Sequence, residues 1–253
     1  MEESKAIDRL LRLLDSLVRD EARTPLNVHA DRLGLPTSTA YRMVQMLRSH
    51  GLVAPAQRGH YMAGLALSEL ARQSAPSAIL AASARPLLRR LARDCRATAH
   101  LGVMDGDMIT YIVKEHGGGT PLFTQEGGQL EAYCSAIGRV LLANLPRAER
   151  EAYLAASPFV ALTRRTVIDP KHIHRLLAKA RRQDFAVDDR EIADDLVCYA
   201  VPVRIGEQVV AAISLSMTHP GLEMQPALDA LHACAARLLS RLAPARDILD
   251  HPV

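Results

Sequence analysis

Six polar side chains lie on one face of a helix predicted between residues 37 and 49, and none of them is acidic. They are Ser38, Tyr41, Arg42, Gln45, Arg48 and Ser49. Arg42 could pair with the two acceptors of a guanine, and Gln45 with the donor and acceptor of an adenine. Ser38 or Thr39, at the start of the helix, could hold a phosphate through a hydroxyl and backbone N–H groups. Most polar helix faces only meet solvent, so the face by itself leaves DNA binding and a plain solvated surface both open.

A second set of polar groups, far along the chain, suits a small anionic ligand. Ser214 and Ser216 alternate with an apolar residue and therefore point to the same face of a predicted strand. Ser135 precedes a predicted helix that begins with Ala136 and Ile137, where free N–H groups and the positive helix end favour a carboxylate. Burial of both strand serines against backbone partners is the alternative.

Catalytic motifs are missing from the sequence. It contains no G-x-S-x-G, H-E-x-x-H or P-loop pattern. Cys198 lies in an apolar stretch typical of a buried structural cysteine. His172 and His174 are two residues apart on a predicted helix and do not share a face, which argues against a metal site. We therefore expect no enzyme activity, no metal and no cofactor, with redox sensing by the cysteines as an alternative.

Three short helices precede a hairpin in the first 62 residues. The first is predicted from apolar residues at helical spacing, which are Ile7, Leu10, Leu11, Leu14, Leu17 and Val18. A second helix, 27–33, ends at Gly34, and Pro36 starts the third, with Thr37 or Ser38 as its expected cap. The inward face of the third helix carries Ala40, Met43, Val44 and Leu47. Residues 51–62 then form a hairpin with Arg58, as expected of a winged helix-turn-helix.

Charge and composition agree with this arrangement. Between residues 22 and 61, five arginines face a single acid, Asp31, although the net charge of all 253 residues is only +3. A local positive field beside a near-neutral remainder is typical of a small DNA-binding domain. The N-terminus has no apolar signal segment, no stretch approaches the roughly 18 apolar residues of a membrane span, and the four cysteines form no C-x-x-C pair. We expect a cytoplasmic protein without a membrane partner.

The rest of the chain alternates helical and strand patterns. A linker helix is predicted within 63–74, ending before Pro76, and Leu87, Leu88 and Leu91 mark a further helix. Segments 98–104 and 108–113 form a predicted hairpin, and further strands are predicted at 185–189, 197–203 and 209–217. Helices are predicted at 137–145, 172–182 and 228–242. The glycines at 117–119 and 127–128 indicate a flexible loop, for which covering a pocket is one possible role.

Seven segments in this order resemble the IclR family of bacterial transcription regulators. In the first part these are 33–42 (LGLPTSTAYR), followed by Leu47, 51–53 (GLV), Tyr61 and Gly64. In the second part they are 135–143 (SAIGRVLLA), 162–168 (LTRRTVI), 185–191 (FAVDDRE), 198–203 (CYAVPV) and 209–216 (VVAAISLS). The resemblance covers nearly the whole chain.

The resemblance implies an α+β protein: an N-terminal winged helix-turn-helix (1–62), a linker helix (63–76), and a C-terminal GAF-like α/β effector-binding domain (77–253) with a central antiparallel sheet. It places the effector between Asp188, Cys198, Ser214 and Ser216. Near this pocket, Tyr133, which we also expect to contact the effector, and Cys134 replace the family's usual His-Ala. Asp195 replaces a common glycine, so the effector of a relative cannot be transferred to this chain. His29 replaces an apolar residue, and we expect Val28 to take over its packing.

The expected function is ligand-responsive regulation of transcription. The partners are double-stranded operator DNA, contacted by Ser38, Thr39, Tyr41, Arg42, Gln45, Arg48 and Arg58, and a small organic effector, expected to be a carboxylic acid. One recognition helix reads only a few base pairs, so a homodimer is the minimum, and the resemblance extends this to a dimer-of-dimers tetramer. Repression of a catabolic operon for small organic or aromatic acids is preferred, and activation is the alternative.

Overall fold

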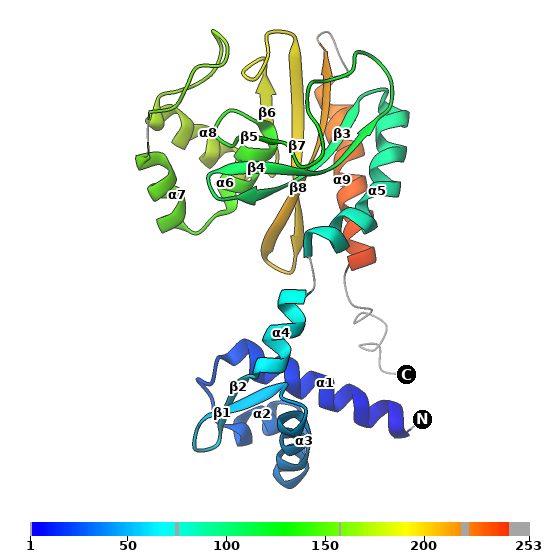
Figure 1. The fold of residues 1–253 in the computed structure, drawn as a ribbon, viewed down its shortest axis with the longest axis vertical. Coiled ribbons are helices and arrows are strands. Elements are labelled where there is room, and N and C mark those ends of the chain that lie inside the picture. Colours follow the sequence, from blue (N-terminus) through cyan, green and yellow to red (C-terminus); the bar gives the residue numbers. More distant parts are fainter. Residues whose placement is uncertain (1, 74–75, 157, 219–222, 243–253) are drawn as a thin grey trace. The chain divides into compact units, whose positions relative to one another are not determined.

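A computed structural model describes residues 2–73, 76–156, 158–218 and 223–242 (Figure 1). The chain divides into two compact units, Met1–Ala75 and Pro76–Val253. The sequence predicts boundaries at 62/63 and 76/77, with a separate linker helix. In the structure that helix, α4 (Leu65–Gln73), lies in the first unit.

The first unit is a helix-turn-helix followed by a two-stranded wing. Its elements are α1 (Glu2–Asp20), α2 (Leu26–Arg32), α3 (Thr37–Ser49), β1 (Val53–Gln57) and β2 (His60–Ala63). Leu13, Leu17, Leu26 and Val44 form the centre of its core. Gly34 has a φ of +61°, a left-handed conformation that glycine adopts without strain, and this allows the tight turn between α2 and α3.

The buried face of α1 differs in part from the predicted one. Leu13 and Leu17 are fully buried, whereas Ile7 and Leu11 are 58% and 57% exposed. The predicted stripe of apolar residues was wide, and this unit covers only one side of it. Two large apolar side chains, one helical turn apart, are therefore left facing solvent.

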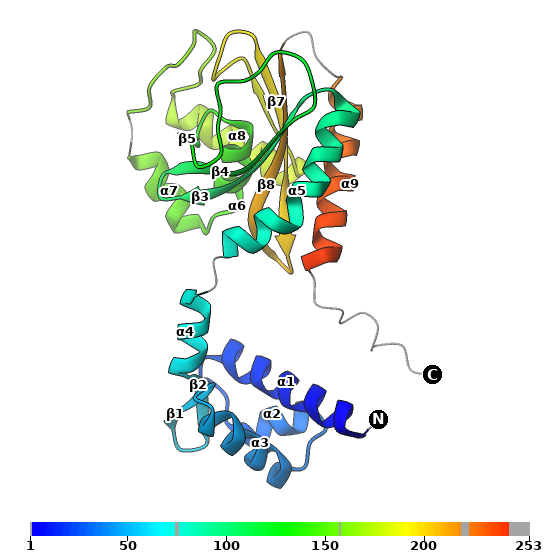
Figure 2. The same ribbon diagram turned by 45° about the vertical axis from the view of Figure 1, so that its right-hand side comes forward.

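The second unit is built on a six-stranded antiparallel sheet with the order β5-β4-β3-β8-β7-β6. The strands are β3 (Thr98–Asp105), β4 (Met108–His116), β5 (Gln129–Glu131), β6 (Ala186–Asp189), β7 (Leu196–Ile205) and β8 (Gln208–Thr218). The helices α5 (Pro76–Cys95) and α9 (Met224–Leu242) pack on one face of the sheet (Figures 1 and 2). On the other face lie α6 (Ala136–Asn144) and α8 (Pro170–Gln183), with α7 (Arg147–Ala155) beside α8.

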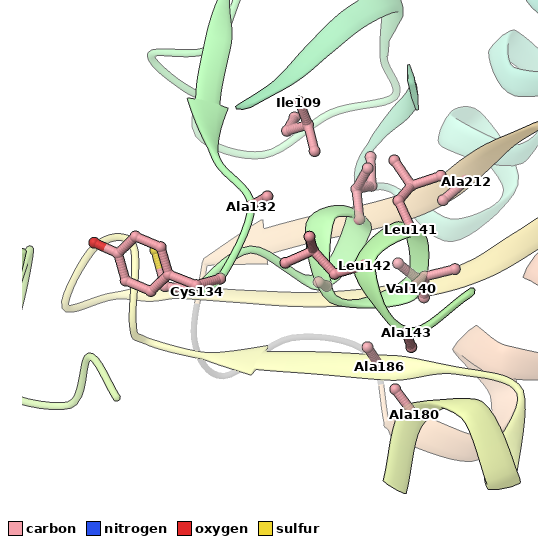
Figure 3. Close-up of a cluster of buried hydrophobic side chains, with 14 of the residues drawn as sticks. Ile109, Ala132, Cys134, Val140, Leu141, Leu142, Ala143, Ala180, Ala186 and Ala212 are labelled. Carbon is pink, nitrogen blue, oxygen red and sulfur yellow. The ribbon is translucent and has the colours of Figure 1, made fainter. Parts of the chain in front are cut away.

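The sheet separates two apolar cores. Ile213 and Leu215 of β8 belong to the core under α5 and α9. Ala212 belongs to the other core, which Figure 3 shows around Val140 and Leu142 of α6. Because side chains alternate between the faces of a strand, Ser214 and Ser216 must lie on the α6 side. The expectation that both serines share one face is therefore met by the fold.

Two elements of this unit were not predicted. The helix α7 buries only Tyr153, so its sequence carries little apolar periodicity. The strand β5 has three residues and pairs with β4 at one edge of the sheet, too short for an alternating pattern to appear. In addition, α5 begins at Pro76, well before the leucines that marked it, with a buried contact already at Leu80.

The predicted fold class is confirmed. The structure has a helix-turn-helix with a wing, and a second unit with a central antiparallel sheet flanked by helices. No helix in the described part of the chain is long and apolar enough to cross a membrane.

Candidate functional site

The outer face of α3 presents polar side chains to solvent. Ser38, Tyr41, Arg42, Gln45 and Arg48 are all exposed, and Thr39 is half-buried. The residues Ala40, Val44 and Leu47 on the opposite side are buried. Arg48 donates a hydrogen bond to Gln45 at 3.3 Å, and the helix contains no acid. These groups are free to meet bases or phosphates.

The start of α3 differs from the prediction. Its N-cap is Pro36, and no side chain makes a capping hydrogen bond there. Neither Thr37 nor Ser38 is the cap, because both already lie inside the helix. The first N–H groups of a helix have no acceptor within it, so this end can donate to a phosphate.

Arg58 lies apart from α3, in the turn of the wing. It is exposed between β1 and β2, next to Gly59, whose φ is +77°. The backbone N–H of Leu26 donates to the carbonyl of Gly59 at 2.8 Å, which ties the wing to the start of α2.

A cavity lies between α6 and the sheet of the second unit. Fourteen residues line it: Tyr111, Leu122, Phe123, Thr124, Leu130, Ser135, Ala136, Ile137, Asp188, Ile192, Leu196, Cys198, Ser214 and Ser216. The free space inside is about 10 Å³, room for a single water molecule. Seven of the eight residues predicted to bind the effector meet at this one place.

The register of the sheet brings these residues together. Asp188 on β6 pairs with Cys198 on β7, and Cys198 pairs with Ser216 on β8. One row across three strands therefore carries a carboxyl, a thiol and a hydroxyl. In the next row, Ser214 pairs with Ala200 on one side and with His100 of β3 on the other.

Asp188 is buried completely and only half satisfied. Its Oδ1 accepts a hydrogen bond from the N–H of Glu191 at 2.8 Å. Its Oδ2 has no hydrogen-bond partner among the described residues. Burial raises the pKa of Asp188 to about 7, and the nearby charge of Glu191 adds to the rise. An unpartnered buried oxygen at a cavity wall lacks a hydrogen bond, which a ligand or a water molecule in the cavity can supply.

The N-terminus of α6 forms the wall opposite the sheet. Ser135 is the N-cap, and its Oγ accepts from the N–H of Gly138 at 3.1 Å. Gly138 is required here, since a Cβ would come within 2.2 Å of the carbonyl oxygen of Ala132. Ala136 and Ile137 line the cavity, so the positive end of the helix points towards it.

A buried ion pair that was not predicted from the sequence holds this wall in place. Arg139 of α6 binds Glu191 through two contacts, of 2.5 and 2.6 Å. Arg139 also donates to the carbonyls of Tyr133 and Val187 at 2.9 and 3.0 Å. Both residues stand in the motif segments 135–143 and 185–191, and this was the one signal that could have found them. The pair joins the start of α6 to the turn after β6, next to Asp188.

Tyr133 is the predicted effector residue that the structure does not bring to the cavity. Its ring packs on Phe159 with the centroids 4.6 Å apart, and its hydroxyl donates to the carbonyl of Val160. Its backbone N–H donates to the hydroxyl of Tyr153 at 3.1 Å. The side chain thus packs away from the lining residues.

The segment 117–128 covers the cavity, which is the role considered from the sequence for its glycine-containing loop. Leu122, Phe123 and Thr124 supply part of the lining. Lys114 of β4 donates from Nζ to the carbonyls of Leu122, at 2.9 Å, and of Thr124. His100 contacts the hydroxyl of Thr124 at 2.9 Å through Nε2. Burial lowers the pKa of His100 to about 3, so this ring is neutral.

Both units match family models. Residues 6–56 match the IclR helix-turn-helix domain, and residues 73–240 match the bacterial transcriptional regulator IclR C-terminal domain. The chain belongs to the IclR family. It is 30% identical over 215 residues to the HTH-type transcriptional regulator XynR of Escherichia coli, covering 84% of this chain and 85% of XynR. It is 31% identical over 222 residues to KdgR of the same organism, covering 84% and 83%.

Solved structures of the IclR family have the same fold. A homologue from Microbacterium hydrocarbonoxydans, complexed with 4-hydroxybenzoate, superimposes with a TM-score of 0.63 at 25% identity. The match covers 94% of this chain and 100% of the homologue. The chain is therefore a DNA-binding, effector-responsive transcription regulator of a family that is not enzymatic, which confirms the predicted class.

The cysteines of this IclR-family chain are all free. Burial raises the pKa of Cys198 well above its usual value, and it raises that of Cys134 to about 12. Both thiols therefore stay protonated and poorly nucleophilic at neutral pH. Among the described residues, no three His, Cys, Asp or Glu side chains gather where they could hold a metal ion.

His29 stands at a position that is usually apolar in the family, and the expectation that Val28 takes over its packing is wrong. It is itself buried, at 1% exposure, whereas Val28 is half-buried. Ser16 of α1 lies 2.7 Å from Nδ1, and the carboxylate of Asp20 lies 3.6 Å from Nε2. A buried imidazole is tolerated here because α1 provides polar neighbours.

Proposed function

We propose that this regulator represses a catabolic operon for small organic or aromatic acids, and that one such acid, bound in the cavity, releases it from its operator. One observation carries the proposal: the unpartnered Oδ2 of Asp188 and the N-terminus of α6 face the same cavity. The complex of a family member with 4-hydroxybenzoate supports an aromatic acid as effector.

Each end of such a ligand has a matching group. The carboxylate would accept hydrogen bonds from the N–H groups of Ala136 and Ile137 beside Ser135, at the positive end of α6. A hydroxyl on the ligand, or a bridging water, would donate to Asp188, because a bare carboxylate would be repelled there. Ser214 and Ser216 would supply further hydroxyl contacts, and Cys198 would form part of the wall. Tyr133 could contact the effector only if its side chain moved from its packing on Phe159 towards the cavity.

Binding requires the cavity to grow. Its free space of about 10 Å³ does not admit an organic acid. The part of the wall that can yield with the smallest loss of packing is the segment 122–124, because Phe123 is 65% exposed. The effector would therefore favour a conformation with this segment displaced, and differential affinity for that conformation would drive the change in DNA binding.

DNA recognition is assigned to the exposed face of α3. Arg42 would pair with guanine and Gln45 with adenine, with Tyr41 beside them in the major groove. Ser38, Thr39 and Arg48 would contact phosphates at the edges of the groove, and Arg58 would contact the adjacent backbone from the wing.

Assembly into a homodimer, and further into a dimer of dimers, is part of the proposal. The exposed apolar side chains Ile7 and Leu11 on α1, and Leu65 and Leu70 on α4, are 57 to 88% exposed. Such side chains on two helices of one unit are suited to a contact with a second copy. Light scattering at micromolar concentration should give at least a dimer, and a monomer with and without DNA would contradict it.

The test begins with a thermal-shift screen of small carboxylic acids, with 4-hydroxybenzoate among them. An acid that raises the melting temperature is then added to gel shifts on the intergenic DNA next to this gene. We expect the acid to weaken the complex, and deletion of the gene to raise expression of the neighbouring operon. Loss of expression on deletion would instead establish an activator, and no response to any acid would contradict the assigned effector class.

A further inference from the structure

Helix α8, on the second unit, has two faces of opposite character. Ile173, Leu177 and Ala180 are buried against the rest of the unit. On the far side, four basic side chains recur every three or four residues and are all exposed. They are Lys171, Arg175, Lys179 and Arg182, and we call them the α8 stripe. At about 100° per residue, the stripe lies directly opposite the buried face.

The α8 stripe is not neutralised by ion pairs, unlike several arginines on the other helices. Arginines on α1, α5 and α7 stand four residues from an acid that they bind, in the pairs Arg12–Asp8, Arg19–Asp15, Arg90–Asp94 and Arg147–Glu151. Helix α8 contains five Lys or Arg residues and no acid. None of the four stripe residues has an ion pair within the described parts of the chain.

The acids at the two ends of α8 are engaged elsewhere. Asp169 is the N-cap, and its carboxylate accepts from the N–H of His172 at 2.8 Å. Asp184 binds Arg204 of β7 at 2.7 Å. Among the helices of the described ranges, only α3 shares with α8 the combination of several basic residues and no acid. That other helix is the one that bears the DNA-recognition side chains.

We infer that the α8 stripe is a second DNA-binding surface, which contacts the phosphate backbone of double-stranded DNA without reading its sequence. From Lys171 to Arg182 the helix rises about 16 Å. One DNA strand carries about five phosphates over that length, which is enough to match four cations on long, adaptable side chains. Lysine and arginine at such spacing bind phosphates as charges and release counterions.

The composition of this face favours DNA over an acidic protein. Protein interfaces centre on aromatic or apolar anchors in desolvated pockets. The large exposed apolar side chains of the described residues include none from α8. A regularly spaced, purely cationic surface is instead typical of contacts with a polyelectrolyte backbone. The inference stands on α8 alone and does not depend on the effector or on the operator sequence.

The experiment uses the full chain and labelled duplexes of arbitrary sequence. The stripe variant combines Lys171→Gln, Arg175→Gln, Lys179→Gln and Arg182→Gln. The control variant combines Arg89→Gln, Arg90→Gln, Arg147→Gln and Arg165→Gln, which removes the same charge from the same unit at exposed arginines that pair with acids. Affinities are measured by fluorescence anisotropy between about 50 and 200 mM salt.

We expect the stripe variant to have a shallower dependence of log affinity on log salt, by about 0.9 for each lost phosphate contact. Its affinity at the low-salt end should fall at least tenfold relative to the control variant, which should keep the wild-type slope. A further variant with Lys171→Arg and Lys179→Arg should bind DNA with the wild-type affinity and salt dependence, because only the charge matters. Circular dichroism and melting curves establish that all variants are folded.

Equal slopes and affinities for the stripe and control variants, both folded, would overturn the inference. So would wild-type DNA binding by the stripe variant combined with altered expression of a reporter, which would point to an acidic protein partner. A loss of this sequence-independent binding would leave the assignment of α3 untouched, since operator specificity is measured separately by competition with unrelated DNA.

Discussion

Arg85 of α5 binds both carboxylate oxygens of Glu126, at 2.7 and 2.9 Å. Glu126 lies in the segment 117–128, whose residues 122–124 close the cavity, and its Oε1 also accepts from the N–H of Lys114 at 2.9 Å. The hydrogen bonds from Arg85 hold the pKa of Glu126 below its usual value, so the contact stays charged at neutral pH. The cover of the cavity is thus fastened to the helix that begins the second unit.

Replacement Glu126→Gln should loosen this cover. Arg85 and Glu126 are both more than one-third exposed, so the pair stabilises the fold by only about 0–1 kcal/mol, and the melting temperature should hardly change. Effector association, followed by stopped-flow methods, should become several-fold faster, because the cover opens more often. Glu149→Gln on α7 serves as the control. An unchanged association rate in the Glu126 variant would show that ligands enter elsewhere.

Asp188→Asn should change the dependence of stability on pH. The folded-state pKa of Asp188 is about 7, against an ordinary value of 3.8. Between those values the folded chain binds more protons than the unfolded chain, so the contribution of Asp188 to stability falls as pH rises through this window. Asparagine does not ionise. We expect the variant to be more stable than the wild type by about 2 kcal/mol at pH 8, and the gain to shrink towards pH 5.

Urea unfolding at several pH values measures this difference. The control is Asp189→Asn, because Asp189 is half-exposed and pairs with Arg165 and Arg190. If the two variants showed the same pH profile, Asp188 would already be charged and satisfied in the folded chain.

Arg42→Ala should weaken specific operator binding by about 1–3 kcal/mol and relax the preference at one base pair. The side chain is exposed on the acid-free face of α3, so its removal should leave the fold intact. Gel shifts on the native promoter measure the effect, with Arg9→Ala on α1 as the matched control. Unchanged affinity and unchanged preference in a folded Arg42 variant would remove α3 from the reading role.

Ser214→Ala should lose the response to the effector while DNA binding stays intact. The hydroxyl is buried, at 2% exposure, and lines the cavity on the row next to Asp188. Titration of a responsive acid into Ser214→Ala and Asp188→Ala, each followed by thermal shift, is the measurement. Ser240→Ala, on the exposed side of α9, is the control. Wild-type affinity in both cavity variants would place the effector on another face of the sheet.

Arg139→Met should destabilise the chain by about 3–5 kcal/mol, because it leaves the buried carboxylate of Glu191 without its partner. The double variant Arg139→Met with Glu191→Met should recover part of this loss, since no charge is then left unpaired. Chemical unfolding of the three proteins gives the coupling. A double variant no more stable than Arg139→Met alone would mean that the pair is not the main role of either residue.

Local periodicity in the sequence was sufficient to predict those features that depend only on residues close together in the chain. The face of α3 follows from residues three and four apart, and the common direction of Ser214 and Ser216 follows from alternation along one strand. For the same reason the order of helices and strands, and with the family resemblance the fold class, could be predicted. The gathering of Ser135, Asp188, Cys198 and Ser216 was expected only through that resemblance.

Tertiary structure decided what depends on residues distant in sequence. The bidentate contact of Arg139 with Glu191 joins residues 52 positions apart, and no local pattern in either segment predicts it. Tyr133 is buried against Phe159, away from the cavity, and His29 is buried against Ser16, whereas Ile7 and Leu11 are exposed. Each of these outcomes depends on which residues from other segments lie beside the side chain in the folded chain. The closure of the cavity by 122–124 likewise depends on Lys114, His100 and Arg85, on three different elements. A sequence pattern indicates which local structure each segment prefers. The contacts between distant segments stabilise the fold only after those segments have packed together, so local patterns do not predict them.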